Sequence, residues 1–243
     1  MIDYVVVSCE HGGNRIPVPY RPLFQTDDSR TLLASHRGFD AGALVMAKEL
    51  AKHFAAPLVT ATVSRLLVDL NRSLDNPRVF STMVRALPAA TRERIVASYY
   101  RPYRARLQSL VLRGIKSGGR VVHISCHSFT PELYGEVRNA DVGLLYDPAR
   151  SGELEYCGRW QNSLKSVAPE LKVRRNYPYS GKNDGLTRHL RQCFSADQYL
   201  GIELEINQKH VTSADRAWHS LRCKLIASLS TLVIGDRSSI RVA

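Results

Sequence analysis

The sequence lacks the features that mark disulfide-rich, membrane-spanning and secreted proteins. Its five cysteines are odd in number and widely spaced, and no Cys-x-x-Cys pair occurs, which argues against a disulfide framework and a cysteine-only zinc site. No apolar run approaches the ~20 residues that a membrane helix needs. The first residues, Met1-Ile2-Asp3, do not begin a basic and then apolar leader. We therefore expect a protein of the reducing cytoplasm without a membrane partner.

The composition fits one globular domain with a basic charge balance. The 243 residues are 44% hydrophobic and 23% charged, and we expect a single domain over 1–235 with a tail over 236–243. The net charge of +12 would suit nucleic acid, an anionic membrane or a small anionic substrate. The densest run of arginines, over 92–113, has the spacing of one amphipathic helix with a solvated face. We therefore favour the small anionic substrate over nucleic acid.

The hydrophobic pattern alternates between buried strands and amphipathic helices. Strands are predicted by short β-branched and apolar runs at 4–7, 58–63, 66–68, 120–126, 141–148 and 199–208. Helices are predicted at 41–51, 88–117, 150–167, 186–193 and 213–232, the second with a break near Pro102. Residues 16–28 contain three prolines and predict an irregular loop. This alternation is typical of an α/β fold.

Ionisable residues stand where several predicted strands end. His11 follows the first strand in Ser-Cys-Glu-His-Gly-Gly-Asn, and His127 follows the strand at 120–126. One such histidine is more often structural, but two at carboxyl ends of strands favour a metal pair. His123 shares a face with His127, so we expect it to support the site from behind the metal-binding residues. In the last strand Glu203 and Glu205 share the face opposite its apolar residues. Such a carboxylate is a candidate general base; the structural alternative is an edge strand with one solvated face.

Two further positions have both a structural and a functional interpretation. Asp40 begins the helix at 41–51, where a carboxylate can cap the helix, and it can equally reach a site. An Asn71-Arg72 pair follows the strand at 66–68. Its guanidinium suits a substrate carboxylate, while a salt bridge of Arg65 or Arg72 with Asp69 is the structural alternative.

The ordered blocks of this sequence resemble the N-formylglutamate amidohydrolase family. They are Ser-Cys-Glu-His-Gly-Gly-Asn, His-Arg-Gly-Phe-Asp-Ala-Gly-Ala, Ser-Arg-Leu-Leu-Val-Asp-Leu-Asn-Arg-Ser, His-Ser-Phe-Thr-Pro and Gly-Ile-Glu-Leu-Glu-Ile-Asn-Gln. The resemblance spans about residues 5–210. That family is similar to a distant branch of the zinc carboxypeptidase and aspartoacylase group. It implies a single-domain, mixed but mostly parallel sheet flanked by helices, zinc-carboxypeptidase-like and phosphorylase/hydrolase-like. It also implies hydrolysis of N-formyl-L-glutamate, as in histidine catabolism.

The resemblance also implies a zinc site. His11 and His127 match the group's two histidine ligands. The group's carboxylate ligand stands three residues after the first histidine, where this chain has Asn14. Because Asn is a poor zinc ligand, residues 15–38 are interpreted as an insertion and Asp40 as the carboxylate, with Glu10 as the fallback.

Two further roles follow from the same resemblance. Asn71 and Arg72 match the pair that binds a substrate carboxylate, and Glu205 matches the glutamate that acts on the zinc-bound water, with Glu203 as the alternative. As our own hypothesis beside the resemblance, Arg65 would assist the oxyanion, and Tyr179, in the loop over 176–185, would close over the substrate.

Three alternatives remain open at this stage. The first is hydrolysis of another N-acyl amino acid or of a peptide amide on the same scaffold. The second is a non-catalytic module that binds anions. The third is a cysteine hydrolase using Cys126 or Cys9. It ranks last because neighbours on a strand, such as Cys126 and His127, point to opposite faces.

Overall fold

The protein is built around one mixed β-sheet with helices on both faces. The computed structural model describes residues 3–211 and 215–238. Within them the sheet has six strands, in the order β2 (Leu58–Thr60), β1 (Asp3–Cys9), β3 (Arg120–Phe129), β8 (Tyr199–Asn207), β6 (Val142–Leu145) and β7 (Val173–Arg175). Strand β6 runs antiparallel to β8, while the other neighbouring pairs are parallel. The predicted single-domain α/β fold with a mostly parallel sheet is confirmed.

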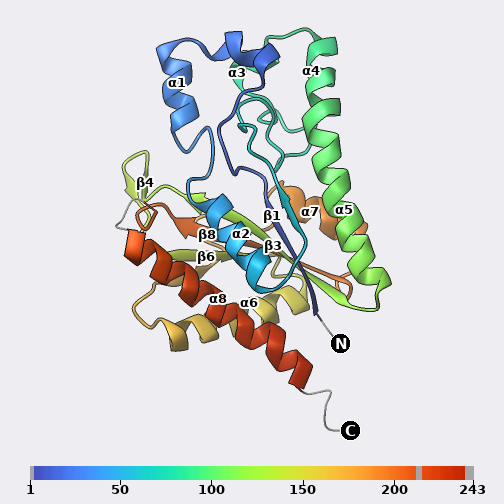
Figure 1. Ribbon diagram of the computed structural model, residues 1–243, viewed down its shortest axis with the longest axis vertical. Helices are drawn as coiled ribbons and strands as arrows, with labels where there is room; N and C mark the ends of the chain where they lie inside the picture. Colours follow the sequence, from blue (N-terminus) through green and yellow to red (C-terminus); the bar gives the residue numbers. More distant parts are fainter. Residues whose placement is uncertain (1–2, 212–214, 239–243) are drawn as a thin grey trace.

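One face of the sheet packs against the helices α2 (Ala43–His53), α6 (Ser151–Val167) and α8 (Asp215–Ser238). Every second residue of the central strands enters this core, including Val7 and Ile124. Helix α2 contributes Ala43, Met46, Ala47, Leu50 and Ala51, whose spacing forms one helical face. In Figure 1, α6 and α8 lie at the bottom of the molecule.

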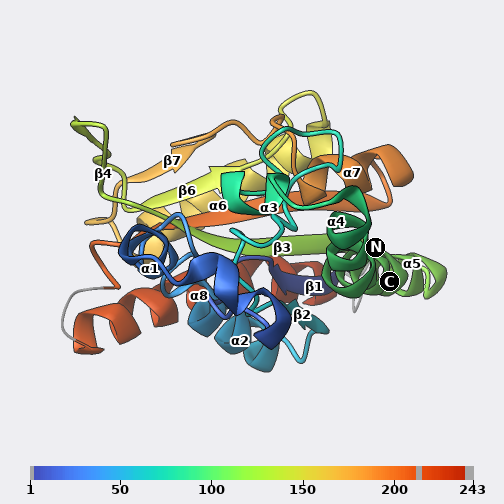
Figure 2. The same ribbon diagram turned by 90° about the horizontal axis from the view of Figure 1, so that it is seen from above.

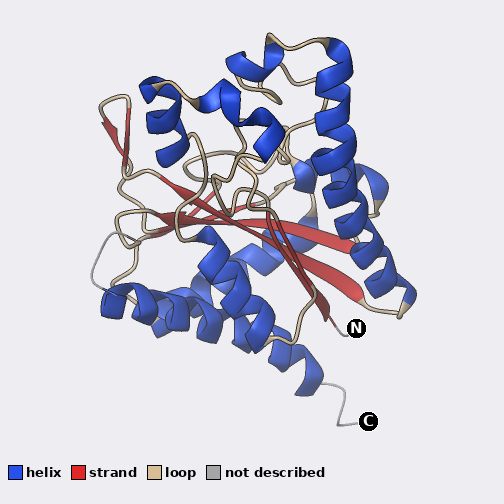
Figure 3. Cartoon of the chain, turned by 45° about the horizontal axis from the view of Figure 1, so that its top comes forward, coloured by secondary structure: helices blue, strands red, loops and turns tan. Residues whose placement is uncertain are grey.

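The other face carries a second core and the remaining helices. They are α1 (Asp27–Ala34), α3 (Thr82–Arg85), α4 (Ala89–Ile95), α5 (Arg101–Lys116) and α7 (Leu186–Cys193). Helix α5 contacts β1, β2 and β3, and α7 contacts β8. Figure 2 views the sheet from above, and Figure 3 shows its strands between helices on both sides. No helix in the described part of the chain is long and apolar enough to cross a membrane.

Several predicted elements differ from the structure. The loop predicted over 16–28 is wrong, because it holds a 3-10 helix, Val18–Phe24, and the start of α1. The prediction of a strand at 66–68 is also wrong, since this apolar run forms a turn. The helix over 88–117 is not broken at Pro102. Instead, a π-helical segment, Val96–Tyr100, joins α4 to α5 without a break, and Pro102 is the second residue of α5.

Several short elements were not predicted, among them helices α1 and α3. Strand β7 is only three residues long, and the hairpin of β4 (Glu132–Leu133) and β5 (Glu136–Val137) projects from the end of β3. Helix α8 extends to Ser238, so the predicted tail over 236–243 begins within it, and residues 239–243 lie outside the described residues.

Candidate active site

The turn after β1 brings His11 to the carboxyl edge of the sheet. This turn pairs closely with the chain after β2, where the amide of Gly12 donates to the carbonyl of Ala61 over 3.0 Å. A Cβ atom on Gly12 would lie 2.9 Å from that carbonyl oxygen, and one on Gly13 would lie 2.9 Å from the oxygen of Thr62. Glycine is therefore needed at both positions for close approach of two backbones.

Asp40 reaches the same place although 28 residues separate it from His11. Its amide donates to the carbonyl of His11 over 2.9 Å, which fixes the returning chain beside the turn. The predicted alternative, a helix-capping carboxylate, is wrong, because α2 begins after Gly42 and has no side-chain cap. The Oδ2 atom of Asp40 instead lies 2.8 Å from Nδ1 of His127 and 3.3 Å from Nδ1 of His11.

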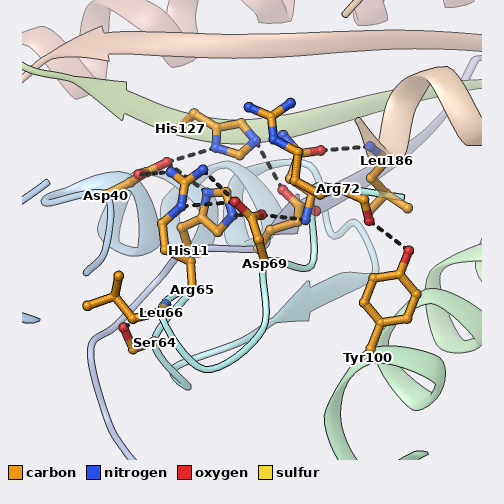
Figure 4. Close-up of polar contacts among 12 residues, drawn as sticks. His11, Asp40, Ser64, Arg65, Leu66, Asp69, Arg72, Tyr100, His127 and Leu186 are labelled. Carbon is orange, nitrogen blue, oxygen red and sulfur yellow. Dashed lines mark hydrogen bonds and ion pairs between the residues drawn. The ribbon is translucent and has the colours of Figure 1, made fainter. Parts of the chain in front are cut away.

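His11, Asp40 and His127 form a buried cluster with the composition of a metal site (Figure 4). One ligand atom from each residue lies within 4.8 Å of the others, and among the described residues this is the group able to hold a metal ion. Two imidazole nitrogens and one carboxylate are the open ligand set of catalytic zinc sites. Glu10, the fallback carboxylate, is not part of the group.

A carboxylate lies behind His11. Nε2 of His11 is 2.8 Å from Oδ1 of Asp69, and Oδ2 of Asp69 accepts a hydrogen bond from Nη2 of Arg65 over 2.7 Å. Arg65 also pairs with Oδ1 of Asp40 at 3.4 Å. The salt bridge between Arg65 and Asp69 is therefore present, while the contact of Asp69 with His11 was missed, because the local sequence gives no sign of a partner 58 residues away.

A second carboxylate, that of Glu10, lies behind His127. Its Oε2 atom is 3.2 Å from Nε2 of His127 and accepts a hydrogen bond from Oγ of Ser125 over 2.6 Å. Its Oε1 atom accepts from Ser8 at 2.6 Å and from Tyr103 at 3.0 Å. With both histidines held at Nε2 by a carboxylate, their Nδ1 atoms face Asp40. This is the arrangement that orients and strengthens metal-binding imidazoles.

Buried polar residues of β1, β3 and β8, among them Ser8, Ser125, His127 and Glu205, form a polar strip on this face of the sheet. His123 belongs to this strip, but its hydrogen bonds go to residues other than His127. Nε2 of His123 lies 2.8 Å from Oγ of Ser8, and its Nδ1 lies 2.8 Å from the hydroxyl of Tyr199. Through Ser8 it is connected to Glu10. The residues of the strip come from β1, β3 and β8 and alternate with apolar residues of the opposite face.

The cluster carries a surplus of negative charge. Burial lowers the pKa of His127, but hydrogen bonds to Asp40 and Glu10 outweigh it and raise that pKa well above its usual value. Burial raises the pKa of Asp40, yet the charges and hydrogen bonds of His11 and His127 bring it far below its usual range. The site thus favours positive charge at its centre, as protons on the imidazoles or as a metal cation.

Glu205 lies next to this cluster and differs in environment from Glu203. In the paired strands Glu205 is the register partner of His127. Its Oε2 atom is buried and has no hydrogen-bond partner among the described residues, and burial raises the pKa of its carboxyl to about 7. Glu203 instead accepts a hydrogen bond from Oγ1 of Thr187 over 2.6 Å. Strand β8 is central, so its polar face is not the wet side of an edge strand.

A cavity of about 320 Å³ lies beside the histidine and Asp40 cluster. The sequence-predicted site residues that line it are His11, Asp40, Arg65, Asn71, Arg72, His127, Tyr179, Glu203 and Glu205. The Oδ1 atom of Asn71 accepts a hydrogen bond from the amide of Leu186 over 2.7 Å, which fixes this side chain at the wall of the cavity. The hydroxyl of Tyr179 accepts from Arg138 over 3.0 Å at the rim.

The cysteine alternative has no geometric basis. Cys9 and Cys126 are buried in the core on the other face of the sheet. Burial raises the pKa of both thiols, which disfavours a thiolate. Neither sulfur is placed to pair with His11 or His127 as nucleophile and base.

Comparison with known proteins points to one family. The family model for N-formylglutamate amidohydrolase matches residues 4–212. A gene product of Agrobacterium tumefaciens is 29% identical, with a TM-score of 0.74 over 94% of this chain and 91% of that one. An N-formylglutamate amidohydrolase from Ralstonia eutropha is 20% identical, with a TM-score of 0.73 over 96% and 94%. At that identity the second likeness shows the fold alone. No curated protein sequence matches the chain.

Proposed function

This chain belongs to the N-formylglutamate amidohydrolase family, and on that premise we propose that it hydrolyses N-formyl-L-glutamate to L-glutamate and formate with the help of a zinc ion. The observation that carries the proposal is the buried carboxylate of Glu205, whose pKa is raised to about 7 and which shares a cavity with His11, Asp40 and His127. We place the reaction in the cytoplasm, because the five cysteines are all unpaired.

The zinc ion would be held by His11, Asp40 and His127. The donor set, the carboxylates behind both imidazoles and the surplus negative charge all fit a divalent cation. A zinc ion bound there would polarise the amide carbonyl and lower the pKa of a water molecule. Arg65, which lines the cavity, would hold Asp40 and Asp69 in place and add positive charge near the carbonyl oxygen.

Glu205 would move the proton. As water adds to the formyl carbonyl, its carboxylate would accept a proton from the water, and it would then donate that proton to the departing nitrogen as the C–N bond breaks. A pKa of about 7 suits both steps, because the group exchanges its proton readily at neutral pH. The Oε2 atom of Glu205 makes no hydrogen bond to the described residues, so this side of the carboxyl group is not held by another part of the protein.

The amino-acid part of the substrate would be held on the opposite side of the cavity. The guanidinium of Arg72 and the side-chain nitrogen of Asn71 would bind its α-carboxylate and so place the amide beside Glu205. Tyr179, whose side chain is 43% exposed at the rim, would close over the bound molecule.

The first experiment measures L-glutamate released from N-formyl-L-glutamate after chelation and again after zinc is restored. We expect activity to disappear and return. Activity that survives complete metal removal would contradict the zinc proposal. A folded, zinc-loaded protein that hydrolyses other N-acyl amino acids but not this one would contradict the substrate.

A matched pair of variants tests the role of Glu205. We expect Glu205→Gln to retain zinc and to lose about 10²- to 10⁴-fold in kcat. Glu203→Gln, two residues along the same face, is the control and should lose much less, since Glu203 is bound to Thr187. An equal loss in both variants would remove the specific assignment to Glu205.

A further inference from the structure

Three arginines line the cavity, and they differ in how their charges are used. Arg65 is committed to Asp69 and Asp40. Arg72 donates from Nη1 to the carbonyl oxygen of Asp184, so part of its guanidinium is fixed toward that loop. In the stretch that the structure describes, the guanidinium of Arg78 makes no hydrogen bond or ion pair, although it faces the same cavity.

The backbone that carries Arg78 is nevertheless firmly held. Its amide donates to Oδ1 of Asn76 over 2.9 Å, while Nδ2 of Asn76 donates to Oδ2 of Asp184 over 2.6 Å. The next residue, Val79, is buried, and its carbonyl accepts the amide of Asp69 over 2.8 Å. Asp69 in turn contacts His11. The loop that carries Arg78 is therefore tied directly to the centre of the site.

Other cavity residues do not supply this free positive charge. Burial, together with the charges of Arg37, Arg65 and Arg138, lowers the pKa of His36, so this imidazole is neutral at pH 7. Ser180 and Asn183, which also line the cavity, are uncharged. An arginine exposed on a smooth surface is ordinarily hydrated and binds no ligand. Here a guanidinium without a protein partner stands on a fixed loop at the mouth of a substrate-sized cavity.

We propose that Arg78 binds the side-chain carboxylate of the substrate and so restricts the enzyme to N-acyl amino acids with an acidic side chain. This inference rests on the proposed function. Arg72 would bind the α-carboxylate and Arg78 the second one, each through the planar donor fork that matches a carboxylate. Removal of the charge at Arg78 then affects acidic substrates selectively, whereas loss of Arg72 affects every N-acyl amino acid.

The test compares N-formyl-L-glutamate with N-formyl-L-glutamine, which has the same shape and no side-chain charge. In Arg78→Gln we expect the preference for the acidic substrate, as the ratio of the two kcat/KM values, to fall about tenfold through KM. Arg113→Gln on α5 removes the same charge away from the cavity and should leave the ratio as in the wild type. An unchanged ratio in Arg78→Gln would overturn the inference while the hydrolase function stands.

A binding measurement decides the inference independently of turnover. Calorimetry with the zinc-loaded protein compares L-glutamate with L-glutamine as ligands. We expect the wild type to prefer L-glutamate and Arg78→Gln to lose that preference. Equal binding of both ligands by the wild type, or a preference kept by the variant, would refute the role of Arg78. Selective binding without any hydrolysis of N-formyl amino acids would support Arg78 and contradict the proposed function.

Discussion

At the scale of single residues, two glutamates on one face of β8 differ in their hydrogen bonding. The hydroxyl of Thr187 donates to the carboxyl group of Glu203, whereas Glu205 is buried without a partner for Oε2 among the described residues. Burial without compensation favours the neutral form of a carboxyl group. The sequence places both residues on the same face, and only their tertiary surroundings separate their roles.

The raised pKa of Glu205 predicts a pH-dependent cost to stability. In the unfolded chain this group ionises near 4.5, while in the folded, metal-free protein it ionises near 7. Between these pH values the folded state keeps a proton that the unfolded state has released. The contribution of Glu205 to the free energy of unfolding therefore falls as pH rises through this window, by up to about 1.4 kcal/mol per pH unit. Above pH 7 the loss is complete.

Glu205→Gln removes that titration. We expect the metal-free variant to be more stable than the metal-free wild type at pH 8 by about 3 kcal/mol, and to have nearly the same stability at pH 4.5. Urea unfolding at the two pH values measures this difference. If the difference in the free energy of unfolding between variant and wild type is the same at both pH values, folding does not raise the pKa of Glu205.

Glu10 gives a second prediction at this scale. Because its carboxylate contacts Nε2 of His127, it orients the Nδ1 atom of that imidazole toward Asp40. We expect Glu10→Gln to weaken zinc binding about 10- to 100-fold without removing a ligand. Competition with a chelator of known affinity measures the change. Asp69→Asn, the matched change behind His11, should act similarly, and unaltered affinity in both variants would contradict a role of these carboxylates in metal binding.

At the scale of elements, the two-residue period of the strands separates the site from the main core. In β1, β3 and β8 one set of alternate residues enters the core that packs against α2, α6 and α8. The other set faces the site side of the sheet, with apolar residues at the start of the strands and polar ones toward their ends. This division could be predicted from the sequence, as could the positions of His11, His127 and Glu205 at the ends of strands. Parallel strands bring such ends to one edge, which is why local patterns located these groups.

What could not be predicted depends on contacts between distant segments. The hydroxyl of Tyr103 reaches Glu10 across 93 residues, and nothing near either residue in the sequence indicates that pairing. The apolar run over 66–68 has the composition of a strand but no neighbouring strand to pair with. The prolines over 16–28 suit a 3-10 helix as well as a loop, since its short hydrogen-bonded turns tolerate missing donors.

The space around two glycines, Gly143 on β6 and Gly158 on α6, predicts opposite effects of replacing each with alanine. A methyl group on Gly143 would overlap the carbonyl oxygen of Tyr177, so Gly143→Ala should lower the free energy of unfolding by about 1–3 kcal/mol. On α6, a methyl group on Gly158 would have Arg175 as its nearest neighbour at 3.8 Å. Gly158→Ala should therefore raise the free energy of unfolding by about 0.5–1 kcal/mol. Urea unfolding of both variants measures the pair, and two changes of the same sign would contradict this packing.

At the scale of the whole molecule, the site exists only when the fold is complete. His11 follows β1, Asp40 precedes α2, His127 lies near the end of β3 and Glu205 lies on β8, so the site joins segments from nearly the whole chain. An unfolded chain holds these residues far apart and offers no preformed site. A metal ion would therefore bind the folded state in strong preference to the unfolded one.

This preference predicts that zinc stabilises the entire protein. At a free zinc concentration of 100 times Kd, the folded state should gain about 2.7 kcal/mol, and Tm should rise with zinc and fall on chelation. His127→Ala should abolish the zinc-dependent rise in Tm, because it removes one of the three proposed ligands. Glu205→Gln should keep that rise, because Glu205 lies outside the ligand group. Differential scanning calorimetry measures all three proteins, and a wild-type Tm that does not respond to zinc would contradict the metal site, since binding to the folded state alone must shift the unfolding equilibrium.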